Sequence, residues 1–176
     1  VDIEFLGHDG FKITNGKTII IDPYQVSEDV GKADILLITH GHYDHCSIED
    51  IRRVIKEGSI VVCPADCQSK ILGIGVKVDM QVVEIKDVID LADLTVECVP
   101  AYNKNKDFHP KSEGWLGYMI KMGKVIVYHA GDTDFIPEMQ KLSGYGKVGN
   151  EFIALLPVSG KFVMDVDEAV DAASVI

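Results

Sequence analysis

The sequence has little of what marks secreted or membrane-embedded proteins. Its four cysteines include no CxxC pair and no dense disulfide pattern, so reduced thiols are expected. It has no apolar run of 18 residues, which argues against a membrane-spanning helix. Val1 to Glu4 carries neither the basic nor the apolar region of a secretory signal. These absences predict a soluble, cytoplasmic protein without a membrane partner.

Positive charge is also scarce. Lys and Arg number 17 against 28 Asp and Glu, which gives a formal net charge of −11. A field of this sign repels a phosphate backbone, so a nucleic-acid partner is not expected. A cationic metal pocket would still accept a small anionic substrate, and a homo-oligomer is compatible with the composition. The length of 176 residues and the 47% hydrophobic content predict a single domain over residues 1–176.

One stretch holds a dense cluster of candidate metal ligands. His40, His42, Asp44 and His45 fall within six positions, directly after the apolar run at residues 35–38. The run predicts a buried strand that ends before Gly41, which places the cluster on a loop at the carboxyl end of that strand. Alternate side chains of an extended segment point the same way, so His40 and His42 are expected to converge on one ion. Asp44 and His45 project differently and are predicted to serve a second ion.

The alternative interpretation is a set of ordinary structural histidines. A lone histidine near a strand end is usually structural or exposed to solvent. Burying several titratable groups together costs several kcal/mol unless a partner compensates them. Imidazole and carboxylate are the ligand types that zinc accepts, and a catalytic site typically combines about three protein ligands with an open position. The density of the cluster therefore favours a metal site.

The remaining pattern predicts alternating strands and helices. Asn15-Gly16 is a two-residue hairpin signal, and Met122-Gly123 is another turn between strands. Ser47 and Asp165 are expected to cap helices. The strands are expected at residues 1–6, 11–14, 17–22, 35–38, 60–63, 79–89, 91–99, 115–121, 124–129 and 152–156, and the helices at 48–57, 64–72, 135–142 and 165–176.

Three further polar residues are candidates for the site. His109 lies in a long polar stretch at residues 102–113, and loops of this length are often functional. Asp132 follows the strand at residues 124–129, and the hairpin before it predicts that His109 and Asp132 lie near the same sheet edge. His129 is a strand residue three before Asp132 and is expected to orient a ligand.

The ligand cluster resembles the HxHxDH signature of the metallo-β-lactamase superfamily. Ala130-Gly131-Asp132-Thr133 is similar to the GDT segment of that superfamily, whose aspartate bridges two metal ions. The chain looks like the small stand-alone metal-dependent hydrolases of this superfamily, the branch that includes L-ascorbate-6-phosphate lactonase. The other segments that carry the resemblance are residues 7–11, 21–23, 128–134 and 156–160.

The resemblance implies both a fold and a ligand set. The fold is α/β of the α+β type, an αββα four-layer sandwich. His109 matches the third histidine of the superfamily, and His8 is implied to lie near the mouth of the site as a substrate contact. Metal one is then held by His40, His42 and His109, and metal two by Asp44 and His45, with Asp132 bridging the two.

The superfamily normally has one more strand, which carries a final histidine for metal two. No histidine follows His129 in this sequence. A chain shortened at its C-terminus, without the last strand, is therefore expected. The alternative is a weaker second metal site that solvent completes.

These residues predict a metal-dependent hydrolase. A bound cation lowers the pKa of water to about 7, so a metal-bound hydroxide attacks a small ester, lactone or phosphoester. Asp44 and Asp132 are the predicted catalytic residues, and one or two divalent ions are expected, with zinc ahead of manganese, iron or nickel. The alternatives are a non-heme iron redox enzyme on the same ligands and a non-catalytic metal-dependent binding protein.

Overall fold

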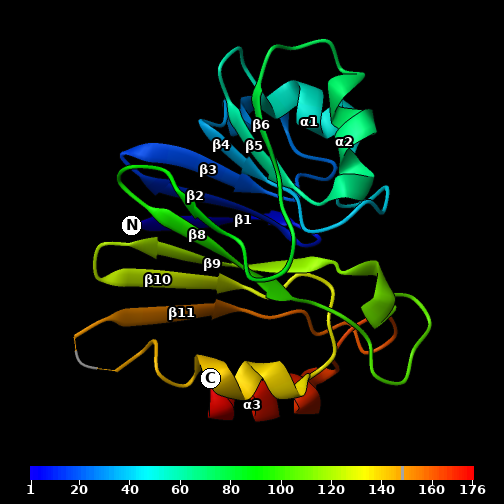
Figure 1. Ribbon diagram of the computed structural model, residues 1–176, viewed down its shortest axis with the longest axis vertical. Helices are drawn as coiled ribbons and strands as arrows, with labels where there is room; N and C mark the ends of the chain where they lie inside the picture. The colour runs from blue at the N-terminus through cyan, green and yellow to red at the C-terminus, as the bar shows by residue number, and fades with distance from the viewer. Residues whose placement is uncertain (148) are drawn as a thin grey trace. The chain divides into compact units, whose positions relative to one another are not determined.

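The computed structural model describes residues 1–147 and 149–176. These residues form two compact units, Val1–Val83 and Glu84–Ile176, which are described in turn. Each unit contains one β-sheet with helical segments (Figure 1).

The first unit is built on a six-stranded sheet. Its strands follow the order of the chain, with antiparallel pairing from β1 to β3 and parallel pairing from β3 to β6. Gly16, with φ of 73°, forms the turn between Asn15 and Lys17, as the hairpin signal predicts. The strands are β1 (Asp2–Gly7), β2 (Gly10–Asn15), β3 (Lys17–Ile21), β4 (Ile35–Leu37), β5 (Ile60–Cys63) and β6 (Asp79–Val82).

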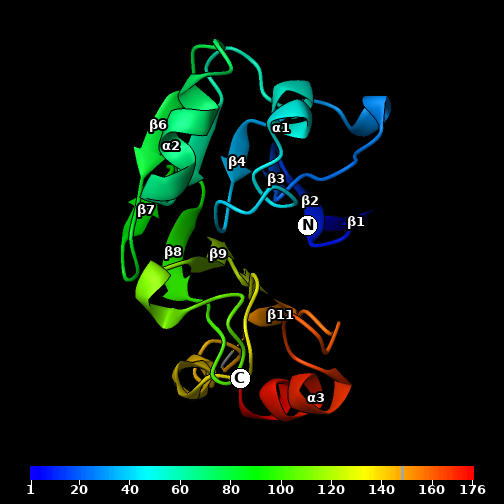
Figure 2. The ribbon, with the colours of Figure 1, turned by 90° about the vertical axis from the view of Figure 1, so that its right-hand side faces the viewer.

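Two α-helices cover one face of this sheet. The helices α1 (Ile48–Val54) and α2 (Ala65–Leu72) bury Ile51 and Ile71 in the same hydrophobic cluster as Leu36 and Val61 of the strands. Figure 2 shows α1 and α2 near each other in this unit. A short 3₁₀ helix, η1 (Glu28–Val30), lies between β3 and β4.

The first of these helices is shorter than predicted. Ser47 caps α1 as expected, but the helix ends at Val54 instead of continuing to residue 57. Ile55 is extended and only 2% exposed, so its side chain is buried in the core rather than on a further helical turn. The Lys32 ammonium donates to the carbonyl oxygens of Arg53 and Ile55, at 2.7 and 3.0 Å, and this satisfies carbonyl groups at the helix end.

The second unit is built on a five-stranded sheet in the order β11-β10-β9-β8-β7. Only β10 and β11 pair in parallel, and the other pairs are antiparallel. Gly123, with φ of 62°, forms the predicted turn between β9 and β10. The strands are β7 (Val88–Asp90), β8 (Thr95–Pro100), β9 (Leu116–Met122), β10 (Val125–His129) and β11 (Glu151–Leu155).

The single strand predicted at residues 79–89 was wrong. Both ends form strands, but β6 pairs with β5 in the first sheet and β7 pairs with β8 in the second. A turn separates them, in which Asp87 accepts a hydrogen bond from the Glu84 amide and Lys86 has φ of 81°. This left-handed backbone is incompatible with a continuous strand.

Helical segments cover one face of the second sheet. The 3₁₀ helix η3 (Pro137–Leu142) and the helix α3 (Val166–Val175) bury Met139 and Ala172 in one cluster with Met119 and Tyr128 of the strands. Figure 1 shows η3 and α3 next to each other, and contacts join them. A third 3₁₀ segment, η2 (Lys111–Glu113), precedes β9.

The starts of α3 and η3 differ in how well the sequence predicted them. Asp165 and Glu168 form a reciprocal capping box at the start of α3, as the cap at Asp165 predicts. The helix predicted at residues 135–142 is a shorter 3₁₀ helix. Ile136 is extended because a residue before proline is driven out of the helical region, so the helix begins at Pro137.

Two sheets with helices confirm the predicted α/β class. Among the residues that the structure describes, no helix is both long and apolar enough to span a bilayer. The single-domain prediction and the missing last strand stay predictions.

Candidate metal centre

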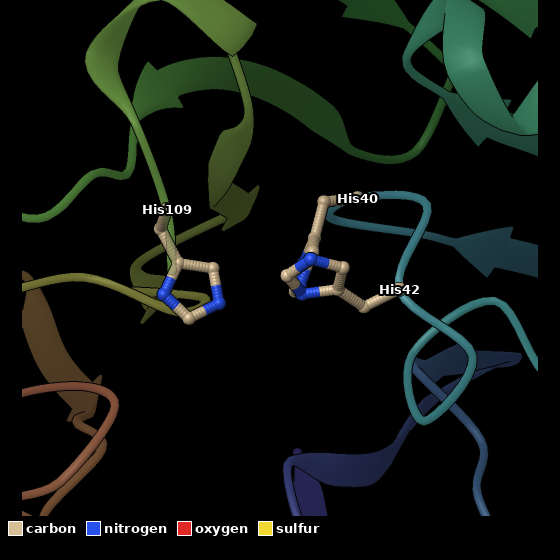
Figure 3. Close-up of side chains that lie close together, drawn as sticks. All are labelled: His40, His42 and His109. Atoms are coloured by element: carbon tan, nitrogen blue, oxygen red, sulfur yellow. The ribbon is translucent and has the colours of Figure 1, made fainter. Parts of the chain in front are cut away.

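In the first unit, His40 and His42 follow β4 on the predicted loop. His40 Nε2 and His42 Nδ1 lie 3.0 Å apart, and their ring planes are at 75° to each other. Figure 3 shows the two rings side by side; it also draws His109, which comes from the loop after β8 in the other unit. Two imidazole nitrogens at this distance are an arrangement that one cation can share.

The hydrogen bonds of Thr39 show which ring nitrogen of His40 carries the proton. The Thr39 hydroxyl donates its single proton to the Asp22 carboxylate, so toward His40 Nδ1, at 2.9 Å, it is the acceptor. His40 therefore carries its proton on Nδ1, and its Nε2 lone pair is directed to His42. This is the tautomer that coordination through Nε2 requires.

Asp22 fixes the tautomer of His45 through a hydrogen bond at Nδ1. The carboxylate of Asp22 is fully buried and accepts from His45 Nδ1 at 2.8 Å and from the Thr39 amide at 2.8 Å. His45 is fully buried as well, and Nε2 is the ring nitrogen that could bind an ion. Ligand-type atoms of Asp22, His40 and His45 lie within 4.8 Å of one another.

Sequence reasoning missed this role of Asp22, to which it assigned only the end of a strand. The signal was present in the segment Ile21-Asp22-Pro23, which is part of the resemblance. Asp22 has φ of 41°, a backbone conformation that is uncommon for any residue but glycine. Its strained backbone and complete burial fit a residue held in place for its side chain.

Asp44 and His8 form a second contact of the first unit. His8 Nε2 lies 3.0 Å from Asp44 Oδ2, and its ring centroid lies 5.3 Å from that of His45. Ligand-type atoms of His8, Asp44 and His45 also lie within 4.8 Å of one another. The half-exposed His8 thus lies beside two predicted ligands, which agrees with its predicted place near the site.

The helix α2 holds the loop between the two histidines. The Gly41 amide donates to Asp66 Oδ2 at 3.0 Å, and Lys70 Nζ donates to the Gly41 carbonyl oxygen at 2.6 Å. A Cβ atom at position 41 would collide with the Asp66 carboxylate. Glycine therefore allows the ligand loop to lie against α2.

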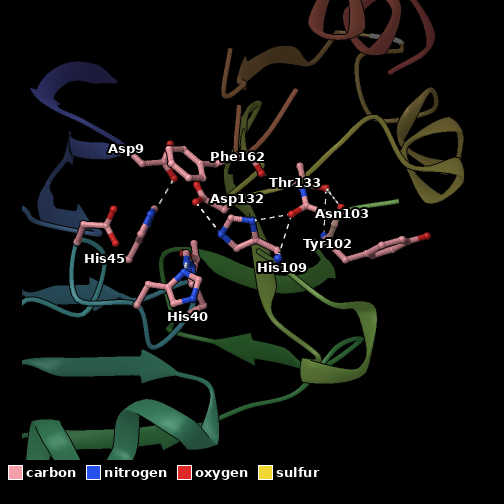
Figure 4. A network of polar contacts seen from close by, with 12 residues as sticks. Asp9, His40, His45, Tyr102, Asn103, His109, Asp132, Thr133 and Phe162 are labelled. Atoms are coloured by element: carbon pink, nitrogen blue, oxygen red, sulfur yellow. Dashed lines mark hydrogen bonds and ion pairs between the residues drawn. The ribbon is translucent and has the colours of Figure 1, made fainter. Parts of the chain in front are cut away.

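In the second unit, His109 contacts Asp132. His109 Nε2 lies 3.0 Å from Asp132 Oδ2, and His109 is 2% exposed. Asp132 follows β10, and His109 belongs to the polar loop after β8, as predicted. Figure 4 shows this contact and the hydrogen bonds around it.

Asn103 orients His109, a role that sequence reasoning missed. Its Oδ1 accepts from the His109 amide at 2.9 Å and from His109 Nδ1 at 3.0 Å. Its Nδ2 donates to Asp134 at 3.0 Å and to the Phe162 carbonyl oxygen at 2.9 Å, which fixes the orientation of the amide. An amide oxygen only accepts, so His109 Nδ1 carries a proton, and Nε2 is the ring nitrogen that faces Asp132.

Asp134 anchors this arrangement. Burial raises the pKa of Asp134, but hydrogen bonds from Lys106, the Lys104 amide and Asn103 outweigh it and hold the pKa below 3.8. The ion pair with Lys106 spans 2.6 Å. Asp134 is therefore a carboxylate that supports Asn103 in the orientation His109 needs.

The loop that carries Asp132 depends on two glycines. Gly131 has φ of 63°, a left-handed conformation that glycine adopts without strain. A Cβ atom on Gly117 of β9 would lie 2.7 Å from the His129 carbonyl oxygen and 2.8 Å from that of Ala130. The buried His129, predicted to orient a ligand, accepts through Nδ1 from the Gly131 amide at 3.3 Å.

The structure thus gathers the predicted residues into two groups. His8, His40, His42, Asp44 and His45 lie together in the first unit, and His109 and Asp132 in the second. Three of the four predicted histidine ligands are held by hydrogen bonds at Nδ1, and carboxylates lie beside them. This donor chemistry fits divalent ions that accept nitrogen and oxygen.

Comparison with known proteins gives the family. Residues 2–176 match the family described as beta-lactamase superfamily domain. The chain belongs to the beta-lactamase superfamily. A relative from Thermoplasma acidophilum, a metal-dependent hydrolase of the group UPF0173, is 31% identical over 97% of this chain and 76% of its own length. The curated relatives therefore carry the class of activity that the ligand cluster predicts.

Solved structures of the superfamily confirm the fold. A protein from Parabacteroides distasonis that carries the name metal-dependent hydrolase has a TM-score of 0.83 and 32% identity, over 97% of this chain and 76% of that one. A zinc-dependent hydrolase of the metallo-β-lactamase superfamily from Thermotoga maritima has a TM-score of 0.59 and 18% identity, over 98% of this chain and 69% of that one, and this likeness concerns the fold alone.

Proposed function

We propose that this chain is a metal-dependent hydrolase that acts on a small ester, lactone or phosphoester. The observation that carries the proposal is that hydrogen bonds fix the tautomers of three candidate histidine ligands. Asp22, Thr39 and Asn103 each occupy the Nδ1 side of a buried imidazole, which leaves Nε2 of His45, His40 and His109 as coordinating atoms. Partners of this kind are typical of metal-ligating histidines.

The proposed ligands are those expected from the sequence. His40, His42 and His109 hold one divalent ion, Asp44 and His45 hold a second, and Asp132 serves both. Zinc is the first candidate, because imidazole and carboxylate ligands suit it. When bound, such ions act as Lewis acids toward the scissile group and lower the pKa of water.

The residues themselves supply positioning and proton transfer. Asp44 is within hydrogen-bonding distance of His8, so His8 is proposed to orient the Asp44 carboxylate. His8 is also proposed to hold a proton near the substrate. The half-exposed His8 ring has access to solvent, as a group that contacts substrate needs. An anionic substrate is compatible with the positive charge that the ions bring to an acidic protein.

The test is a metal-reconstituted activity screen on ester, lactone and phosphodiester substrates. We expect hydrolysis of at least one class, and loss of both bound metal and activity in Asp132→Ala. The matched control is Asp171→Ala, which removes an exposed carboxylate on α3. A metal-loaded protein without activity on the whole panel would contradict the hydrolase proposal, and full retention of metal by Asp132→Ala would contradict the ligand assignment.

A second measurement asks whether both units serve the same ions. His42→Ala and His109→Ala are each predicted to lower the zinc stoichiometry and affinity, and the free-energy loss of the double variant is predicted to differ from the sum of the two single losses. Ligands that act on one ion are not additive. Strictly additive losses would show that each unit binds its ions independently.

A further inference from the structure

The second unit contains a cavity that the proposed metal ligands do not line. Its volume is about 430 Å³, and its walls come from β8, β10 and η3. The wall is mainly apolar, with Val99, Ile136, Met139 and Leu142 among its side chains. Clefts of about 300 to 1,000 Å³ with apolar walls and a few polar groups are typical of small-molecule sites.

One polar group in the wall is the phenol of Tyr128. Tyr128 is 1% exposed, and its hydroxyl makes no hydrogen bond with any residue that the structure describes. Burial raises the pKa of Tyr128 well above its ordinary value, so the hydroxyl keeps its proton. The hydroxyl is therefore a donor that an acceptor on a ligand in the cavity would satisfy.

The charges around the cavity favour an anion. Its two carboxylates are already paired: Glu97 with Lys121 at 2.7 Å and Glu138 with Lys111 at 3.0 Å. Two more lysines, Lys86 and Lys141, line the cavity and form no ion pair within the described part of the chain. An excess of positive charge at a cavity of a protein with net charge −11 is unexpected from composition.

We propose that this cavity binds a small carboxylate with an apolar body. The Tyr128 hydroxyl donates to a carboxylate oxygen, Lys86 and Lys141 attract the negative charge, and the apolar body packs against Met139 and Leu142. The proposal does not depend on the hydrolase activity, because none of the residues that line the cavity is a proposed metal ligand.

The experiment is isothermal titration calorimetry of the metal-loaded protein with octanoate and with its neutral analogue octanamide. Octanoate is expected to bind more tightly than octanamide. Lys86→Gln combined with Lys141→Gln should weaken octanoate binding about fivefold, as the loss of a partly exposed ion pair does, and leave octanamide unchanged. Tyr128→Phe should weaken both by about fivefold, because both ligands offer an oxygen acceptor.

Leu142→Trp is designed to fill the cavity and is expected to abolish binding of both ligands. The matched control is Leu72→Trp, on an exposed leucine of the first unit, which should leave both affinities as they are. The two lysines are exposed, so their variants report on binding even where Leu142→Trp fails to fold. Octanoate that binds only at the metal ions would be insensitive to the lysine, Tyr128 and Leu142 substitutions, and that result would overturn the proposal. Equal affinity for the two ligands would overturn it as well.

Discussion

At the scale of single residues, Asn103 is the side chain on which the orientation of His109 depends. Asn103→Ala removes the acceptor of two His109 N–H groups and leaves them buried. Unsatisfied buried donors cost about 1–3 kcal/mol, and loss of such a partner typically lowers metal affinity by about 10 to 100 times. We therefore expect weaker zinc binding, measured by competition with a chromogenic chelator, and a lower free energy of unfolding in urea.

The control is Asn150→Ala, whose side chain donates to the Tyr145 carbonyl oxygen at an exposed position. It should leave zinc affinity unchanged. If Asn103→Ala bound zinc as the natural protein does, Asn103 would not be a positioning residue for His109.

The candidate ligands could be proposed from the sequence because most of them are neighbours in it. His40 to His45 stand out by density alone, whereas their supporting partners come from elsewhere in the chain. Asp22 lies 23 positions before His45, and Asn103 sits among the ordinary polar residues of a loop. A single aspartate or asparagine carries no pattern, so only the folded backbone shows which imidazole it contacts.

At the scale of elements, β9 and the end of β10 approach so closely at Gly117 that a side chain has no room. In Gly117→Ala, the new methyl group would meet the backbone oxygens of His129 and Ala130, at 2.7 and 2.8 Å. Backbone atoms cannot turn away as a side chain can, so the strand ends must separate. Overpacking of this kind costs about 1–3 kcal/mol, and the Asp132 loop should shift with it. We expect a lower urea midpoint and weaker zinc binding.

Gly144→Ala is the matched control, because a Cβ atom there would meet nothing within 4 Å and the backbone is not left-handed. It should leave stability and zinc binding nearly unchanged. Equal effects of the two substitutions would show that the close approach at Gly117 does not matter.

Most strands could be predicted from alternation and turn residues, and both hairpin turns are where Asn15-Gly16 and Met122-Gly123 indicate. The predictions failed where tertiary packing decides the bounds of a strand or helix. Residues 79–89 resemble one strand in their pattern, yet their two ends pair with different sheets. The end of α1 is set by the burial of Ile55, which local pattern does not reveal.

At the scale of the whole molecule, two effects of acid oppose each other. The net charge of −11 implies self-repulsion that protonation of carboxylates relieves, and this favours the folded state. Carboxylates with a lowered pKa work in the other direction. Lys56 and the Thr18 amide hold the pKa of Asp34 below 3.8 in the first unit. In the second unit, burial raises the pKa of Glu138, but Tyr102 and Lys111 outweigh it and hold the pKa below 4.5.

The sign of the pH dependence follows from these pKa values. A carboxyl group whose pKa is lower in the folded than in the unfolded state stabilises the protein above its unfolded pKa, and this contribution is lost as the pH falls through the folded value. Self-repulsion between exposed charges is screened at about 0.15 M salt, where the Debye length is about 8 Å. The paired carboxylates therefore decide the outcome at that ionic strength. We expect the urea midpoint of metal-free protein to stay level from pH 7 to about 5 and to fall below about 4.5.

Glu138→Gln identifies the source of this loss. The amide cannot ionise, so the variant should be less stable than the natural protein at pH 7 and should lose less stability on acidification. Metal-free protein is used because protonation of histidine ligands would otherwise release the ions in the same pH range. Glu113→Gln, at an exposed position of η2, provides the control and should follow the natural curve. A midpoint that rises on acidification at 0.15 M salt would show that self-repulsion, and not the pairing of Asp34 and Glu138, governs the stability of this acidic chain.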